Sequence, residues 1–131
     1  MASLVTNNGL AEIVGAVVDA NDARFLQWGE GSGQVATDNA LDDVGDTTED
    51  RTAGTMSAQT ENTTGDTIQI VGTITAAGTR AITEVGVFDA AGSGSPPTGG
   101  DMVFYGDHSA VNLGTGDSVT YTVKVTLSQA A

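Results

Sequence analysis

The segment Val119-Thr-Tyr-Thr-Val-Lys-Val-Thr-Leu127 indicates the fold of this chain most clearly. Apolar side chains occupy every second position from Val119 to Leu127, and threonine or lysine fills the positions between them. Successive side chains of a strand point to opposite faces of its sheet. The alternation therefore predicts a long β-strand with one face buried and the other exposed to water.

The same period of two continues upstream of this strand. It predicts strands over residues 52–61, 67–75, 81–89 and 102–105, and a short extended segment over 24–28. In the 67–75 strand, Ile68, Ile70 and Ile74 share one face. Turn-forming residues between the strands, such as those of 62–66 and 76–79, indicate short connections.

Near the N-terminus the period changes to that of a helix. Apolar residues recur at the spacing of one helical face, namely Leu10, Ile13, Val14, Val17 and Val18. Asn7 or Asn8 is expected to cap this helix, and Asp19-Ala-Asn-Asp22 to end it. One helix and roughly five strands predict a mainly β chain, a single β-sandwich or jelly-roll-like domain over residues 1–131 with one N-terminal helix.

Two segments read as loops. Residues 37–50 are rich in carboxylates and poor in large apolar side chains, which predicts a solvated acidic loop or arm. Residues 90–100 contain four glycines and two prolines and predict an exposed loop. Both are candidate contact elements for a partner.

The charge of the chain narrows its possible partners. Seventeen acidic residues oppose four basic ones, which gives a formal net charge of -13. Nucleic acids and anionic membranes bind clustered lysine and arginine, so neither is expected as a partner. No apolar run reaches the roughly 18 residues that a membrane span needs. A dense carboxylate surface with a single lysine is typical of a protein that works in high salt, where charge repulsion is screened.

Five carboxylates of the acidic loop are the candidate metal ligands: Asp42, Asp43, Asp46, Glu49 and Asp50. Calcium accepts several carboxylate oxygens in flexible geometry, although the spacing does not match a calcium-binding EF-hand. The alternative interpretation, which we favour, is a solvated acidic loop with no metal or other cofactor.

Glu84 stands out because it lies within a strand that is apolar on both faces. Ile82 and Phe88 are expected on one face together with Glu84, and Val85 and Val87 on the other, which is typical of a central strand. A buried carboxylate needs a partner, and Arg80 or Arg51 is the predicted one. We expect a structural ion pair rather than an acid–base catalyst.

No catalytic constellation is recognisable. The chain has one histidine, His108, and no cysteine, and Gly92-Ser-Gly-Ser-Pro96 has proline where a nucleophile elbow needs glycine. Gly29-Glu-Gly-Ser-Gly33 lacks the lysine of a phosphate-binding loop. We expect His108 at the surface or in a turn. The aromatic residues Phe25, Trp28, Phe104 and Tyr105 could form a contact surface, but core filling is the expected role.

Several blocks of the sequence resemble small structural proteins of the particles of tailed bacteriophages and archaeal viruses. The most distinctive is Ile82-Thr-Glu-Val-Gly-Val-Phe-Asp89, which is similar to the I-T-E-x-G-[LV]-F strand of that group. The other blocks, in the same order, are 5–10, 26–29, 51–55, 70–75 and 112–119. The resemblance extends from about Leu4 to Leu127, and this chain departs from the bacteriophage examples by its additional acidic residues.

The resemblance implies a structural role in a virus particle and no enzymatic activity. The predicted function is a capsid decoration or cement protein of a tailed virus with a halophilic host, located on the capsid surface. Its expected partners are the major capsid protein and copies of itself, because decoration proteins sit on a lattice, often as oligomers. A tail, baseplate or fibre component is the first alternative, and a module that binds the host surface is the second.

Overall fold

The structure, a computed structural model, describes residues 3–129. Seven strands and one helix follow one another in the order α1 (Asn7–Ala20), β1 (Phe25–Gly29), β2 (Thr52–Ala53), β3 (Thr55–Gln59), β4 (Thr67–Thr75), β5 (Arg80–Phe88), β6 (Met102–Leu113) and β7 (Ser118–Thr126). All strand pairs are antiparallel, and they form a four-stranded sheet, β2-β1-β5-β6, and a three-stranded sheet, β3-β4-β7. The predicted β-sandwich with one N-terminal helix is confirmed.

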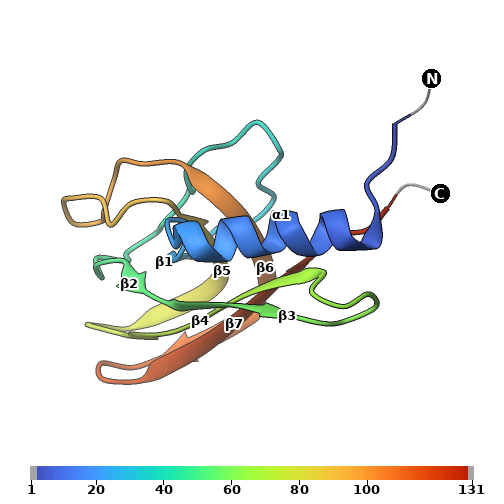
Figure 1. Cartoon of the computed structure of the whole chain (residues 1–131). Helices are drawn as coiled ribbons and strands as arrows, with labels where there is room; N and C mark the ends of the chain where they lie inside the picture. Colours follow the sequence, from blue (N-terminus) through green and yellow to red (C-terminus); the bar gives the residue numbers. More distant parts are fainter. Residues whose placement is uncertain (1–2, 130–131) are drawn as a thin grey trace.

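The core lies between the two sheets and is closed on one side by α1 (Figure 1). Its most buried side chains include Leu26 and Trp28 from β1 and Ile70 from β4. The isoleucine face predicted for β4 is confirmed, as is the alternation of β7, whose apolar side chains face the core. No helix in the described part of the chain is long and apolar enough to span a membrane.

Helix α1 begins one residue earlier than predicted. Its N-cap is Thr6, whose Oγ1 accepts a hydrogen bond from the backbone N–H of Gly9 at 3.0 Å, rather than Asn7 or Asn8. Leu10 and Val14 are buried as expected, but Ile13 is 45% exposed. The apolar stripe is therefore narrower than the sequence suggests, since α1 lies at the side of the sandwich, against β3 and β4, rather than across a full sheet.

The segment predicted as one strand over residues 52–61 is divided at Gly54. Residues before Gly54 pair with β1 in one sheet, and residues after it pair with β4 in the other. A side chain at position 54 would have its Cβ only 2.7 Å from a methyl group of Ile70, so glycine is needed where the chain passes between the sheets. The backbone N–H of Gly54 donates to the carbonyl of Arg24 at 2.7 Å and holds this corner.

The predicted turn over residues 62–66 is confirmed, and Asp66 organises it. The buried Asp66 carboxylate accepts hydrogen bonds from the backbone N–H groups of Glu61, Thr63 and Asn62 at 2.8–3.0 Å. These bonds hold the pKa of Asp66 well below its usual range.

Strand β5 is central in the four-stranded sheet, as its apolar character predicted, but one assignment of its faces is wrong. An irregularity in the pairing with β6 falls between Ile82 and Glu84. It places Ile82 in the core between the sheets together with Val85 and Val87. Phe88 and Glu84 are buried outside that core, beneath the loops that cover the other face of the sheet.

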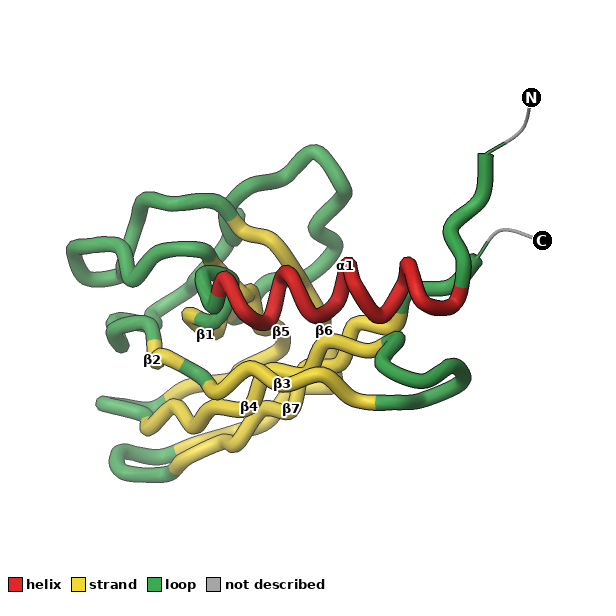
Figure 2. Tube along the Cα trace, in the orientation of Figure 1, coloured by secondary structure: helices red, strands yellow, loops and turns green. Residues whose placement is uncertain are grey.

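Those loops are the connection 30–51, which contains the acidic loop 37–50, and the segment 90–100, and they gather on the same side of the molecule (Figure 2). The 90–100 segment is a mostly exposed loop, as predicted. Residues 37–50 form a loop with mostly exposed side chains, as predicted, but they do not form an arm that extends away from the domain. They fold back over the four-stranded sheet, where Thr47 is buried and Leu41 and Val44 are half-buried.

Candidate interaction surface

The outer face of the three-stranded sheet is the most unusual surface of the molecule. It points away from the core and lies on the opposite side of the sandwich from the acidic loops (Figure 1). Its composition follows from the alternation along β3, β4 and β7, which turns every second residue outward. The residues turned to this side are Thr55, Ser57, Gln59, Thr67, Gln69, Val71, Thr73, Thr75, Ser118, Thr120, Thr122, Lys124 and Thr126, of which Thr67 is itself buried. We call this set the threonine face.

No residue of the threonine face is a carboxylate, although the chain carries seventeen of them. Its one charged member, Lys124, pairs with Glu61 of the turn after β3, with 2.7 Å between Nζ and Oε1. Hydroxyl groups bond across β4 and β7 at three places: Thr67 to Thr126 at 2.9 Å, Thr73 to Thr120 at 2.8 Å and Thr75 to Ser118 at 2.6 Å. The face is therefore mostly polar and free of carboxylates, and these hydroxyl bonds link its side chains across β4 and β7.

The carboxylates predicted as metal ligands lie on the opposite side of the sandwich. Asp42, Asp43, Asp46 and Asp50 are exposed, whereas Glu49 turns inward. Within residues 3–129, no three aspartate, glutamate or histidine side chains come close enough to hold a metal ion. The structure therefore does not bring these five carboxylates together as one ligand set.

Glu49 instead joins three parts of the fold. Its Oε2 accepts a hydrogen bond from Trp28 Nε1 at 3.0 Å, and its Oε1 accepts from the backbone N–H of Ala77 and from Arg80 Nε, both at 2.9 Å. The carboxylate ties the acidic loop to β1 and to the start of β5. Burial opposes its ionisation, but the bonds from Ala77, Trp28 and Thr48 outweigh this and lower the pKa of Glu49 to about 2.

Replacing Glu49 by glutamine is expected to destabilise the protein at pH 7, because the ion pair with Arg80 is lost. The folded-state pKa of Glu49 lies below its ordinary value of 4.5, so its contribution is present above pH 4.5 and is lost as pH falls towards about 2. The difference in unfolding free energy between wild type and Glu49→Gln should therefore shrink over that range. Urea unfolding at several pH values measures it, and Glu12→Gln on the exposed side of α1 is the control. A difference that stays constant with pH would contradict this role for Glu49.

Glu84 is fully buried, as predicted, but neither arginine is its partner. Its Oε2 accepts a hydrogen bond from the Tyr105 hydroxyl at 2.8 Å, and its Oε1 accepts a longer one from the backbone N–H of Gly31 at 3.3 Å. Burial and the bond to Glu84 raise the pKa of Tyr105 to about 12. A Cβ atom at position 29 would lie 2.5 Å from the Glu84 carboxylate, so Gly29 and Gly31 make room for it.

The two arginines predicted for Glu84 act elsewhere. Arg80 pairs with Glu49. The guanidinium of Arg51 is buried: Nε donates to Gln27 Oε1 at 2.9 Å, and Nη1 donates to the carbonyls of Ala90 and Gly99 at 2.9 and 2.7 Å. Arg51 thus holds both ends of the 90–100 loop. The spacing of these residues in the sequence offers no signal for either partnership, because both are long-range.

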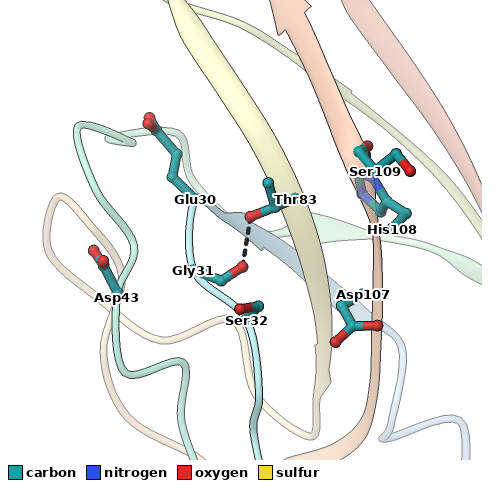
Figure 3. Close-up of a pocket in the computed structure, with 8 residues that line it drawn as sticks. All are labelled: Glu30, Gly31, Ser32, Asp43, Thr83, Asp107, His108 and Ser109. Atoms are coloured by element: carbon teal, nitrogen blue, oxygen red, sulfur yellow. Dashed lines mark hydrogen bonds between the residues drawn. The ribbon is translucent and has the colours of Figure 1, made fainter.

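An open groove lies between the Glu30–Ser32 segment, β5 and β6, and Figure 3 shows the residues that line it. His108 lies in strand β6 rather than in a turn, and it is half-buried. Its Nε2 shares a hydrogen bond with the Tyr121 hydroxyl at 3.0 Å, and its Nδ1 lies 2.8 Å from the Ser109 carbonyl. The carboxylate of Glu30 points away from His108 in Figure 3, and Thr83 Oγ1 donates to the Gly31 carbonyl. Neither ring nitrogen of His108 is bonded to a carboxylate of the groove, and we assign no catalytic role to it.

The aromatic residues do not form a contact surface. Trp28 is buried in the core, Phe104 packs against that core, and Phe25 and Tyr105 are half-buried.

No protein-family model matches this chain, and a search of curated proteins finds no similar protein. The threonine face is thus the feature of the structure on which a functional proposal can be built.

Proposed function

We propose that this chain is a structural protein of a virus particle, a decoration or cement protein on the capsid of a tailed virus with a halophilic host. The observation that carries the proposal is the threonine face. In a chain of net charge -13, one ordered sheet face is free of carboxylates. Like charges that meet at an interface cost several kcal/mol, so an acidic protein associates best through an uncharged surface. The acidic loops would then face the surrounding brine.

Two further features support a structural role. The sequence resembles small virion proteins over most of its length, most distinctively at Ile82–Asp89 in β5. The fold is a small sandwich whose long loops are tied down by Glu49 and Arg51, which suits a rigid clamp on a lattice. The host-binding alternative has less support, since Trp28 is buried and Tyr105 is bonded to Glu84, which leaves no aromatic platform for a sugar.

Copy number in purified virions tests the location. A decoration protein should occur in a simple ratio to the major capsid protein, at hundreds of copies per particle, as measured by quantitative mass spectrometry. A handful of copies would indicate a tail or baseplate component and would overturn the decoration proposal. Absence from the particle would overturn the virion role altogether.

The threonine face itself is tested by a matched pair of substitutions. Thr73→Asp places a carboxylate on β4, the middle strand of the face, and Thr115→Asp places the same charge in the exposed turn between β6 and β7. Binding to capsids stripped of this protein should weaken at least about tenfold for Thr73→Asp and change little for Thr115→Asp. Equal binding by both variants, with unchanged circular dichroism, would show that another surface contacts the capsid.

A further inference from the structure

Strand β7 has a free edge. On one side it pairs with β4 without interruption, from Ser118 opposite Thr75 to Thr126 opposite Thr67. On the other side, no strand of residues 3–129 pairs with it. The nearest element there is β6 of the other sheet, and the bond between His108 and Tyr121 links the two strands across the sandwich rather than along the edge.

The free edge of β7 lacks most of the features that protect such edges. Natural edge strands are kept apart by charged side chains, lysine above all, by prolines, bulges or a covering segment, and Lys124 is the one such residue in β7. Residues 118–126 contain no proline, glycine or carboxylate, and Lys124 is their single charge. The other three edges are better protected: α1 packs along β3, β2 is only two residues long, and β6 has irregular pairing and is met at Met102 by the backbone of Asn39.

Apolar side chains near this edge are incompletely covered. Val119, Val123 and Val125 point toward the core, yet each remains half-exposed, as does Leu127 just beyond the strand. Their neighbours on β4, Ile68, Ile70 and Ile74, are buried because that strand is flanked on both sides. A further strand beside β7 would cover the valines in the same way.

We propose that a second copy of this chain occupies the edge, with β7 pairing antiparallel to β7 of the partner about a two-fold axis at Thr122. The polar–apolar alternation allows only registers that place apolar residues opposite apolar ones. Only the register centred on Thr122 overlaps all of Ser118–Thr126. It sets Val119 opposite Val125 of the partner subunit and Thr120 opposite Lys124 of the partner subunit, so no like charges meet directly.

Charge favours a second copy at this edge over pairing through the loops. Two chains of net charge -13 repel each other, and the carboxylate-free strand is where they approach at least cost. Pairing through β7 would also double the three-stranded sheet and join two threonine faces into one continuous surface. The dimer does not rest on the capsid proposal, since it is measured on the isolated protein.

A single cysteine provides the test, because the chain has none of its own. Thr122→Cys places a thiol opposite its own copy, at a Cα separation of about 4.5–5.5 Å, within the range of a disulfide. Thr55→Cys, exposed on β3 at the other edge of the same sheet, is the matched control. Mild oxidation at low protein concentration should convert most of the Thr122→Cys variant into a covalent dimer and leave Thr55→Cys monomeric. Equal cross-linking of both variants, or faster cross-linking of Thr55→Cys, would overturn the proposal.

The unmodified protein gives an independent measurement. Light scattering after gel filtration in about 1 M KCl, where charges are screened beyond about 3 Å, should give twice the monomer mass of 13.1 kDa. Lower salt should weaken the dimer. Thr122→Asp should raise its dissociation constant at least about tenfold, while Thr55→Asp should not. A monomer at all salt concentrations, or a dimer unaffected by Thr122→Asp, would overturn it.

Discussion

Replacing Phe88 by alanine is expected to lower the free energy of unfolding by about 3–5 kcal/mol, the usual cost of truncating a buried phenylalanine. Phe88 is 1% exposed and lies on the face of β5 that the loops cover. The guanidinium of Arg51 stacks on its ring at 3.7 Å from the centroid. Truncation would leave a cavity beneath both loops, next to the Arg51 guanidinium.

Chemical denaturation with a two-state fit measures this cost, and Phe25→Ala is the matched control. Phe25 is paired with Phe88 across β1 and β5 and also carries an arginine on its ring, but it is only half-buried. Phe25→Ala should therefore lower the free energy of unfolding clearly less than Phe88→Ala does. A Phe88→Ala variant as stable as wild type would mean that the loops do not pack on this face of the sheet.

Replacing Arg51 by methionine should cost about 3–5 kcal/mol as well, for a different reason. Methionine fills much of the same space but donates no hydrogen bond. It would leave Gln27 Oε1 and the carbonyls of Ala90 and Gly99 without their donor, and a buried acceptor without a partner costs about 1–3 kcal/mol. The 90–100 loop would lose its attachment at both ends.

Two measurements separate this effect from a general loss of stability. Limited proteolysis should cut Arg51→Met within residues 90–100 under conditions in which the wild type is resistant. The double variant Arg51→Met/Phe88→Ala should cost less than the sum of the two single changes, because the side chains are in contact. Strict additivity, or cleavage elsewhere first, would contradict the structural role of Arg51.

Some features of the fold follow from local pattern alone. The strict alternation of residues 119–127 and the isoleucines of β4 correctly predict which side chains face the core, since a strand turns successive side chains to opposite sides. The turn over 62–66 and the loop over 90–100 follow from the conformational preferences of Asn, Asp, Gly and Pro. The central position of β5 follows from its having apolar residues on both faces.

The predictions that the structure contradicts share one origin: the residues that contact each other are distant in the sequence. The irregular pairing of β5 with β6 reverses the face of Ile82, and only the partner strand reveals it. The acidic loop looks solvated because it is rich in carboxylates and poor in large apolar side chains, yet Glu49 turns inward to Trp28, Ala77 and Arg80. The sequence predicts an arginine as the partner of the Glu84 carboxylate, but the carboxylate instead accepts hydrogen bonds from the Tyr105 hydroxyl and the backbone N–H of Gly31.

The sequence by itself determined that this protein is a β-sandwich with one helix, strongly acidic, with no recognisable catalytic constellation. Residue type and spacing are sufficient for those features. The period of apolar side chains depends only on residues close together in the sequence, and the net charge is a sum over the whole chain. Only the tertiary structure decided which surface of the protein carries no carboxylate side chains. The threonine face and the open edge of β7 arise when β7 pairs with β4 of the β3–β4 hairpin, which lies far upstream in the chain, and the three strands turn a set of residues without carboxylates to one side.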